Sequence, residues 1–257
     1  MFIDSHCHLQ DKKFSRDLDN VLERAGSTGV EKIICVGTSL KDSKEVLRLS
    51  EKYNQVFATV GIYPNEEVPA GDFREELITL AKHRKVVAIG ECGLDYSNWK
   101  GGREPDLQKE LFRKQVGTAV QLDLPLVIHN RNADEDILLE LAHYKTTGKL
   151  KGVFHCFTSD IEFAKKVLDL GFYISFTAMI TYPSAKHLED VIKFIPNDRL
   201  LAETDAPYLP PQTHRGERNE PMHVKMTAEK MAQVKGISQA DFYAQLLNNT
   251  QNLFALN

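Results

Sequence analysis

Eight short apolar segments alternate with amphipathic segments along the whole chain, and this alternation restricts the folds open to it. The apolar segments are rich in β-branched residues and cover Phe2–His6, Lys32–Val36, Val56–Gly61, Val86–Glu91, Leu126–His129, Gly152–His155, Phe172–Phe176 and Leu200–Thr204. Most are apolar on both faces, as strands are when helices cover a parallel sheet. Eight strands, each followed by a helix, predict an α/β fold of the (β/α)8 TIM-barrel class.

The segments between these strands have the pattern of helices that bury one face. They cover Arg16–Ser27, Lys41–Tyr53, Asp72–Lys82, Pro105–Leu122, Ala133–Tyr144, Ile161–Leu170 and Ser184–Phe194. The last stretch, Pro221–Leu256, is expected to hold two helices divided near Gly236, with Ser238 capping the second. No linker or repeat divides the 257 residues, so we expect one TIM-barrel domain over residues 1–257. An open, doubly wound sheet shows the same alternation and is the alternative.

Composition narrows the class of protein further. The hydrophobic fraction of 42% and the charged fraction of 26% are those of an ordinary soluble globular protein. The formal net charge of −4 argues against binding of nucleic acid through the overall field, although a local basic groove or a phosphate bridged by cations remains compatible with it. The N-terminus lacks the features of a signal peptide, and no apolar run is long enough to span a membrane. No feature indicates an obligate protein partner.

The four cysteines, which are Cys7, Cys35, Cys92 and Cys156, are far apart and form no Cys-x-x-Cys motif. Each lies within or just after a predicted strand, so we expect small buried thiols rather than a disulfide framework. Free thiols fit a reducing compartment, and we therefore expect a cytoplasmic protein.

Potential metal ligands recur at the ends of the predicted strands. The first strand ends in His6-Cys7-His8, and alternation of side chains places His6 and His8 on one face. Four further residues end or follow later strands, namely Glu91, His129, His155 and Asp205. In a (β/α)8 barrel the carboxyl ends of the strands meet at one mouth, where active sites lie. We therefore expect these six side chains to converge.

Four imidazoles and two carboxylates suit two divalent cations, such as Mg²⁺, Mn²⁺ or Zn²⁺. Mixed ligands of this kind leave positions open for water and substrate, as a catalytic site requires. Glu91 is the natural bridge, because one carboxylate has two oxygens and the fourth strand lies between the two groups of ligands. The pattern predicts a catalytic centre with two divalent metal cations per chain, in which Glu91 and Asp205 are the catalytic carboxylates.

Other polar residues follow the same strands. Asp95 and Glu203 are expected to orient metal-binding histidines by accepting their free N–H groups, although Asp95 could equally be a cap. Arg131, together with Arg215 and Arg218 in the long loop after the eighth strand, is expected to contact a phosphate, with plain surface charge as the alternative.

Further candidates lie outside these motifs. Trp99, with Lys100 and Arg103, could stack a nucleic-acid base, although a loop anchored by one buried aromatic explains it equally. His214 lies in the long loop and could touch a substrate, whereas His223 is expected on a helix.

Six motifs together resemble the TatD family of metal-dependent deoxyribonucleases, within the wider amidohydrolase-like enzymes. They are Phe2-Ile3-Asp4-Ser5-His6-Cys7-His8, Gly90-Glu91-Cys92-Gly93-Leu94-Asp95, His129-Asn130-Arg131, His155-Cys156-Phe157, Glu203-Thr204-Asp205-Ala206-Pro207-Tyr208 and Arg218-Asn219-Glu220-Pro221. The resemblance covers essentially the whole chain and implies a (β/α)8 barrel that hydrolyses DNA. It implies one metal ion held by His6, His8, Glu91 and Asp205, and a second held by Glu91, His129 and His155.

Two departures from the family pattern stand out. After the third strand the family usually has a Gly-x-His-Pro sequence, whereas this chain has Gly61-Ile62-Tyr63-Pro64. Tyr63 can donate a hydrogen bond to a substrate at that mouth, but it cannot act as an imidazole acid. After the sixth strand the family often has a glycine where this chain has Thr158-Ser159-Asp160.

The leading hypothesis is a metal-dependent deoxyribonuclease that cleaves phosphodiester bonds by metal-activated water, with Asp205 receiving the proton. Single-stranded DNA is the expected substrate, since a barrel mouth admits one strand more readily than two, and the resemblance implies 3′-to-5′ exonuclease action. The alternative is metal-dependent hydrolysis of a non-DNA ester, amide, small phosphoester or aminoacyl-RNA linkage on the same scaffold. A non-catalytic scaffold is the third reading, and uncompensated carboxylates and imidazoles at one mouth argue against it.

Overall fold

The fold is a barrel of eight parallel strands, seen here in a computed structural model that describes residues 1–69, 71–97 and 102–256. Each strand lies between its neighbours in sequence, in the order β1 to β8. The strands are β1 Phe2–Cys7, β2 Val30–Val36, β3 Val56–Val60, β4 Val86–Asp95, β5 Leu126–Arg131, β6 Gly152–Phe154, β7 Tyr173–Phe176 and β8 Leu200–Ala202. A doubly wound sheet would reverse its order at a switch point, so the sequential order excludes that alternative and confirms the predicted fold class.

The barrel closes between β8 and β1 mainly through residues at the carboxyl ends of these strands. Cys7 and Ala206 form an isolated parallel bridge. The carboxylate of Asp4 accepts hydrogen bonds from the backbone N–H of Thr204, at 2.9 Å, and from its hydroxyl, at 2.6 Å. The segment after β8 is therefore held against β1 by backbone and side-chain hydrogen bonds.

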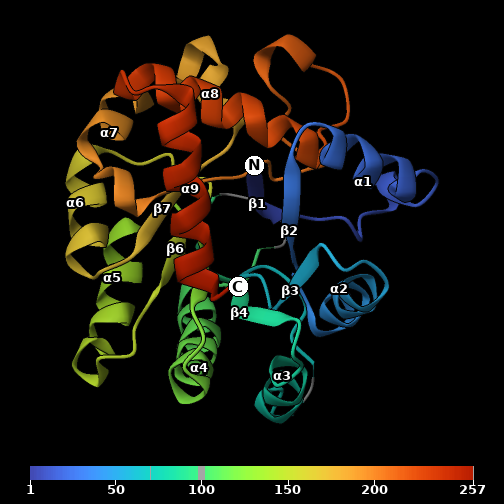
Figure 1. Ribbon diagram of the computed structural model, residues 1–257. Helices are drawn as coiled ribbons and strands as arrows, with labels where there is room; N and C mark the ends of the chain where they lie inside the picture. The colour runs from blue at the N-terminus through green and yellow to red at the C-terminus, as the bar shows by residue number, and fades with distance from the viewer. Residues whose placement is uncertain (70, 98–101, 257) are drawn as a thin grey trace.

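Helices surround the barrel, as Figure 1 shows. They are α1 Leu18–Ser27, α2 Leu40–Lys52, α3 Arg74–Ala81, α4 Pro105–Leu122, α5 Asp134–Ala142, α6 Ile161–Asp169, α7 Leu188–Phe194, α8 Val224–Lys235 and α9 Gln239–Phe254. The predicted boundaries hold to within a few residues, and Ser238 caps α9 by accepting from the backbone N–H of Asp241. Helix α7 begins later than predicted, because Pro183–Ala185 forms a separate 3₁₀ turn. None of the helices described is long and apolar enough to cross a bilayer.

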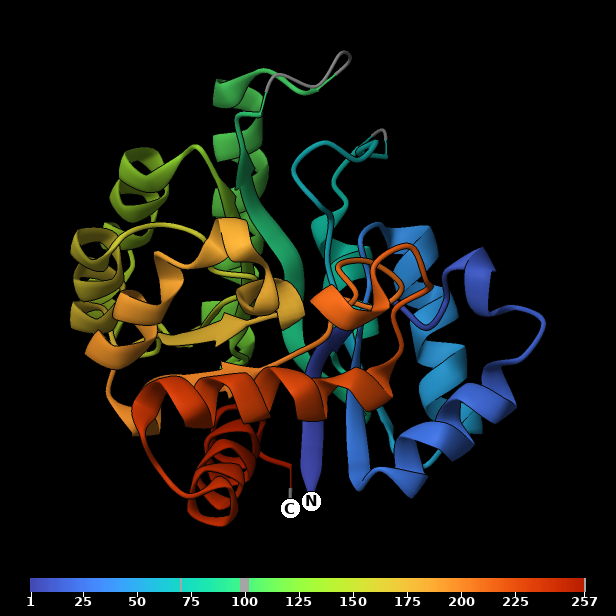
Figure 2. The ribbon, with the colours of Figure 1, turned by 90° about the horizontal axis from the view of Figure 1, so that it is seen from above.

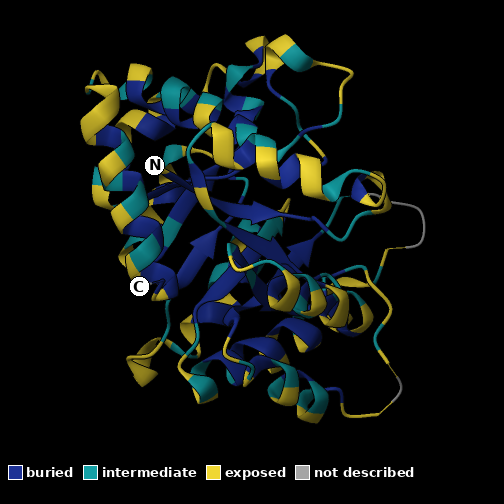
Figure 3. Ribbon diagram, turned by 45° about the vertical axis from the view of Figure 1, so that its right-hand side comes forward, coloured by how far each residue is buried: buried dark blue, intermediate teal, exposed yellow. Residues whose placement is uncertain are grey.

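The inward-facing residues change from apolar to polar along several of the strands. Val127, Val153 and Leu201 belong to an inner apolar cluster that also contains the end of α9. Two residues further along their strands, alternation points His129 and His155 into the same interior. In Figure 1 both termini lie in the middle of the ring of helices, and Figure 3 shows that the strands are buried while exposed residues lie on the outer sides of the helices. One end of the barrel is thus filled with apolar side chains, and the other is polar.

A bulge in β1 places the first two candidate ligands. Ile3 packs in the inner cluster, whereas Cys7 packs in the cluster shared with the helices. Strict alternation would put Ile3 and Cys7 on the same face, but the pairing with β2 shifts register between Asp4 and Cys7. The extra residue turns His6 and His8 toward the interior.

Strand β4 is longer than predicted and continues beyond Glu91 to Asp95, pairing with β5 as far as Arg131 (Figure 2). The glycine at position 93 allows a close approach of two strands. Its φ is +143°, and a Cβ there would overlap the carbonyl oxygen of His129. Asp95 is therefore a strand residue rather than a loop or cap residue.

The thiols are all free, as predicted. Cys7, Cys35 and Cys92 are buried, whereas Cys156 is only partly buried because it follows His155 at the mouth of the barrel.

Candidate metal centre

Six side chains from five strand ends converge at the carboxyl end of the barrel. They are His6 and His8 from β1 and the residue after it, Glu91 from β4, His129 from β5, and His155 and Asp205 from the segments after β6 and β8. His6 is fully buried, and Glu91 retains 3% of its exposure. The sequence predicted this convergence, and the contacts below describe it.

The first donor set consists of His6, His8, Asp205 and one oxygen of Glu91. Asp205 Oδ1 lies 3.3 Å from His8 Nε2 and 3.7 Å from His6 Nε2, and the two Nε2 atoms are 3.3 Å apart. Glu91 Oε2 lies 3.6 Å from His6 Nε2 and 3.9 Å from His8 Nε2. Tetrahedral ligands about 2.0–2.2 Å from one ion lie roughly 3.3–3.6 Å from one another, so these atoms are spaced to share a cation.

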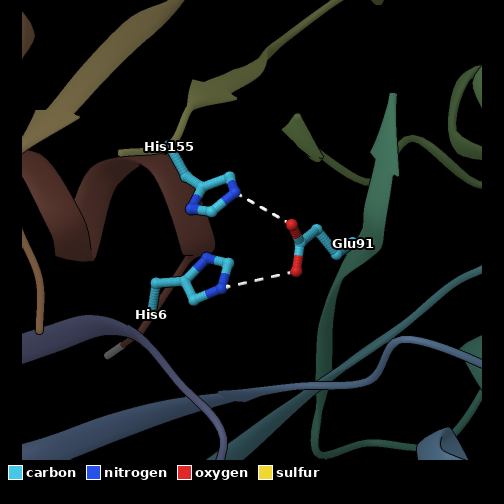
Figure 4. A group of neighbouring side chains, drawn as sticks. All are labelled: His6, Glu91 and His155. Atoms are coloured by element: carbon cyan, nitrogen blue, oxygen red, sulfur yellow. Dashed lines mark hydrogen bonds and ion pairs between the residues drawn. The ribbon is translucent and has the colours of Figure 1, made fainter. Parts of the chain in front are cut away.

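The second donor set uses the other oxygen of Glu91. Glu91 Oε1 lies 2.9 Å from His155 Nε2 and 3.1 Å from His129 Nδ1, and these two nitrogens are 3.3 Å apart. Figure 4 shows how the carboxylate of Glu91 faces His155 with one oxygen and His6 with the other. Glu91 therefore joins the two sets, as the sequence predicted for a bridging carboxylate.

The chemistry of the donors fits divalent cations. Imidazole nitrogens and carboxylate oxygens point at one another, and two neutral imidazoles facing through Nε2 can share at most one proton between them. Buried acceptors that converge in this way are costly unless positive charge lies among them. His, Asp and Glu together accommodate Zn²⁺, Mn²⁺ and related ions, and the spacing leaves the choice of ion open.

Without a cation, protons must supply the positive charge, and the pKa values show where. Burial would lower the pKa of His8, but the hydrogen bond and charge of Asp205 outweigh it and raise that pKa to about 9. Burial is likewise outweighed at His155 and His129, whose pKa values are raised, chiefly by Glu91 at the former and by Asp95 and Glu91 at the latter. Burial, followed by the neighbouring His155, holds the pKa of His6 well below its usual range.

The opposite ring nitrogens of three histidines are held by oxygen atoms outside the centre. His8 Nδ1 lies 3.0 Å from the carbonyl oxygen of Val36, and His129 Nε2 lies 3.3 Å from Asp95 Oδ2. His155 Nδ1 lies 3.5 Å from Glu203 Oε1, a charge contact rather than a short hydrogen bond. Such partners fix the ring and its tautomer, so the structure gives Asp95 and Glu203 the positions predicted for orienting residues.

Asp95 and Glu203 are themselves held in place, by partners that the sequence analysis missed. Glu203 accepts from the backbone N–H of Cys156 at 2.7 Å and from the hydroxyl of Ser175 at 2.6 Å. Asp95 accepts from the backbone and the hydroxyl of Ser97. Alternation along β7 could have identified Ser175 as inward-facing, and an Asp followed two residues later by Ser is a known turn signal. The carbonyl of Val36 leaves no signal in the sequence.

Tyr63 lies at the edge of the second donor set. Its hydroxyl donates to Asp95 Oδ2 at 2.5 Å and lies 3.3 Å from His129 Nε2. Burial, followed by the hydrogen bond to Asp95, raises the pKa of Tyr63 far above its usual value, so the phenol stays protonated. Tyr63 therefore stands behind a candidate ligand, in contact with the residue that orients it.

The structure does not bring all three predicted arginines to the centre. Arg131 is exposed at the end of β5, where its charge influences Tyr63. Arg215 is exposed, and its guanidinium lies 4.6 Å from the centre of the Tyr182 ring. Arg218 is engaged elsewhere, because it donates to the carboxylates of Asp17 and Glu220, each at 2.7 Å. The predicted phosphate contact of Arg218 is therefore replaced by an ion-pair network.

Three of the other candidates lie within the described residues, where they contact other groups. Trp99 and Lys100 lie outside the described residues, and the guanidinium of Arg103 donates to the carbonyl oxygens of Pro64 and Glu66. His223 lies in the 3₁₀ turn η7, Pro221–His223, just before α8 rather than on a long helix. His214 is in the 3₁₀ turn η6, Gln212–His214, and its Nδ1 forms a hydrogen bond of 2.8 Å with Glu217 Oε2.

A hollow of about 680 Å³ opens at the same end of the barrel and is lined by residues that follow His129 and His155 in the sequence. Its walls come from the segments after β4, β5 and β6, and they include Tyr96, Arg131, Thr158 and Ser159. The Thr158-Ser159 sequence, which departs from the family pattern, therefore forms part of this wall.

Comparison with known proteins agrees with this architecture. The family model described as "TatD related DNase" matches residues 3–255. The chain is 40% identical to a Bacillus subtilis protein named "uncharacterized metal-dependent hydrolase YabD", with all of both chains covered. It is 37% identical to "uncharacterized metal-dependent hydrolase YcfH" of Escherichia coli K12, over 99% of this chain and 96% of that protein.

Solved structures show the same fold. The crystal structure of YjjV, a TatD homologue from Escherichia coli K12, superimposes with a TM-score of 0.92 at 32% identity and covers 100% of this chain and 98% of its own. A hydrolase of the TatD family from Entamoeba histolytica superimposes with a TM-score of 0.87 at 27% identity, covering 98% of this chain and 97% of its own.

Proposed function

The chain belongs to the TatD family of metal-dependent hydrolases, and from that premise we propose that it is a deoxyribonuclease acting on single-stranded DNA. The observation that supports the proposal most is the pair of donor sets joined by the two oxygens of Glu91. Two neighbouring cations, when bound, would supply positive charge to a phosphate, and two would do so more effectively than one.

The residues of the centre have distinct tasks in this proposal. His6, His8, Asp205 and Glu91 would hold one cation, and Glu91, His129 and His155 would hold the other. When bound, such cations supply positive charge to the phosphate and make water more acidic. Glu91 is buried with both oxygens facing imidazoles, so it serves as a bridging ligand rather than as a proton acceptor.

Asp205 is proposed as the carboxylate that receives the proton of the attacking water. Its side chain is 16% exposed, whereas that of Glu91 is only 5% exposed, so solvent reaches Asp205 more easily. Its Oδ1 contacts His8 and His6, which holds the carboxylate at the edge of the first set. A base in this position can take a proton without leaving its neighbours.

Groups around the centre would position the phosphate and its nucleotides. Arg131 is exposed at the mouth and would pair with a phosphate oxygen, and the neighbouring hollow would receive part of the substrate. Arg215, also exposed, is proposed to contact the strand further from the centre. Attack from the 3′ end of a single strand, rather than within a duplex, suits a centre recessed in a barrel mouth.

One observation favours a second candidate function. Tyr63 stands where the family usually has a histidine, and its hydroxyl is used on Asp95. If that imidazole protonates the leaving group in other members, this chain lacks the acid, and an ester or amide with a better leaving group becomes a suitable substrate. Hydrolysis of a non-DNA ester, amide, small phosphoester or aminoacyl-RNA linkage is therefore the alternative.

The test uses purified protein and a single-stranded oligonucleotide labelled at either the 5′ or the 3′ end. Reactions contain Mg²⁺, Mn²⁺, Zn²⁺ or EDTA, with Asp205→Asn as the inactive variant. Asp169→Asn, a change to an exposed carboxylate on α6, is the matched control.

Metal-dependent, stepwise shortening that is lost in Asp205→Asn and kept in Asp169→Asn would support the proposal and give the polarity. Absence of shortening with every ion, from protein that binds metal, would refute it and direct the search to other esters and amides. An active Asp205→Asn protein would refute the role of Asp205 alone.

A further inference from the structure

An exposed aromatic ring lies directly beside the first donor set. Tyr208 follows Asp205 by three residues and is 45% exposed. The other large apolar side chains exposed in the described part of the chain are Met1, at the N-terminus, and Leu107, Leu139 and Phe194, on helices α4, α5 and α7. Tyr208 is therefore the one of this group that lies at the mouth of the barrel.

The ring of Tyr208 is close to a candidate ligand. Its centroid lies 6.1 Å from that of His8, with the two rings inclined at 64°. The backbone N–H of Tyr208 donates to the carbonyl oxygen of Asp205 at 2.9 Å, which ties the ring to the segment that carries the proposed base. A nucleotide whose phosphate sits at the centre would have a neighbouring base within reach of this ring.

The ring is held rigidly although it is exposed. The hydroxyl of Tyr208 donates to Asp11 Oδ2 at 2.9 Å, and its carbonyl oxygen accepts from Nδ2 of the fully buried Asn219 at 2.6 Å. Both ends of the residue are thus fixed, and a ligand that stacks on the ring would lose little entropy of the side chain.

A lysine accompanies the ring. Lys13, in the 3₁₀ turn η1, Lys12–Phe14, places its Nζ 4.8 Å from the centre of the Tyr208 ring. The side chain of Lys13 is exposed, and no carboxylate among the described residues lies within ion-pair distance of its ammonium. Arg218 donates to the carbonyl oxygen of Lys13 at 2.6 Å and to Asp17, so the network that occupies Arg218 holds this turn in place.

We propose that Tyr208 and Lys13 form a subsite for a nucleotide next to the bond that is cleaved. The exposed part of the ring stacks on the base, and the ammonium pairs with a phosphate of the strand. An aromatic face beside a cation is the combination by which proteins bind single strands without reading their sequence. The inference rests on the proposed deoxyribonuclease function and deepens it by naming residues that recognise a base.

Tyr208 contacts Asp11 and Lys13, both in the loop after β1. These contacts also allow a purely structural role, in which Tyr208 holds two loops together like a strut. A strut would matter equally for every substrate, and its loss would lower the melting temperature. A stacking subsite matters only for strands that carry bases. The test therefore compares an ordinary single strand with an abasic strand of the same length.

The variants are Tyr208→Leu, which keeps bulk without an aromatic face, and Tyr208→Phe, which keeps the face but loses the bond to Asp11. Lys13→Ala is paired with Lys12→Ala, because Lys12 is also exposed in the same turn. The readouts are KM and kcat/KM on both strands, Kd from fluorescence anisotropy in the Asp205→Asn background, and the melting temperature.

Stacking of one base is worth about 5- to 150-fold in affinity, so Tyr208→Leu should lower the preference for the base-bearing strand over the abasic strand by that factor. The loss should appear in KM and Kd, and Tyr208→Phe should recover most of it. Lys13→Ala should flatten the dependence of log Kd on log salt by roughly 0.7, whereas Lys12→Ala should leave the slope as it was.

An equal effect of Tyr208→Leu on both strands, or no effect on either, would overturn the subsite while leaving the nuclease intact. A parent protein that neither binds nor cleaves any single strand would overturn the proposed function and the subsite together.

Discussion

Replacement of Glu203 by Gln should weaken one metal site and spare the other. Glu203 Oε1 lies 3.5 Å from His155 Nδ1, and its two oxygens accept from the Cys156 N–H and the Ser175 hydroxyl. A glutamine has nearly the same shape, and its amide can keep both hydrogen bonds if the Ser175 hydroxyl turns to accept. What the variant loses is the negative charge that makes His155 a better ligand.

The expected magnitude follows from that loss. Removal of an orienting partner of this kind typically weakens metal binding about 10- to 100-fold, which corresponds to roughly 1.4 to 2.7 kcal/mol. The effect should fall on the set that contains His129 and His155, because the contacts of His8 and Asp205 do not involve Glu203.

The effect should also depend on pH. In the metal-free protein the pKa of His155 is raised, with burial opposing and with Glu91 and Glu203 both raising it, so a proton competes with the cation. Glu203→Gln lowers that pKa and so relieves the competition at low pH. The deficit in affinity should therefore be largest at high pH, where neither protein carries the proton.

The assay is a titration of metal-free protein with Zn²⁺ in competition with a chromophoric chelator, and circular dichroism checks the fold. Loss of one binding step in His129→Ala identifies the step that belongs to the second set. Glu140→Gln is the matched control, since Glu140 is a buried glutamate bonded to Arg113 on α4, away from the centre. Unchanged affinity in Glu203→Gln, or equal weakening of both steps, would refute the reasoning.

Three further predictions concern protons, packing and backbone. Because the pKa of His8 is about 9 and those of His129 and His155 are raised, cation binding at neutral pH should release protons and tighten as pH rises. Calorimetry in buffers with different ionisation enthalpies measures the number of protons released. Equal heats of binding in all buffers would contradict the prediction. Phe112→Ala, at a fully buried position on α4, should lower the free energy of unfolding by about 3–5 kcal/mol in urea titrations, and a loss below about 1 kcal/mol would show that the barrel collapses around the gap. Gly93→Ala should impair folding or metal binding, because the new Cβ overlaps the backbone of His129. The control Gly26→Ala, in open space on α1, should raise the unfolding free energy by roughly 0.5–1 kcal/mol. A well-folded, metal-binding Gly93→Ala protein would refute the close approach of β4 and β5.

The sequence determined the order and type of the elements. Strand and helix periodicities are local, and eight βα units leave few topologies, so the barrel followed from the pattern alone. The barrel in turn placed His6, Glu91, His129 and Asp205 at one mouth, since parallel strands end together. The sequence also indicated Asp95 and Glu203 as residues that orient histidines.

The sequence alone could not determine which side chains form ion pairs or hydrogen bonds with each other. Arg218 was expected to contact a phosphate, but it forms an ion pair with Asp17, some 200 positions away in the chain. The need for a glycine at position 93 arises only from the tertiary structure, because the backbone of β5 at His129 occupies the space that a Cβ would need. The bulge that turns His6 inward depends on the pairing with β2.

The difference between the features that the sequence determined and those that depended on the tertiary structure has a physical reason. Secondary structure and face are set by interactions within a few residues, and these leave a periodic mark that can be read along the chain. The bridging position of Glu91, the contact of Tyr63 with Asp95 and the rigid exposure of Tyr208 depend on atoms brought together by closure of the barrel. Distances between such atoms are decided by packing, and packing leaves no periodic signal in the order of the residues.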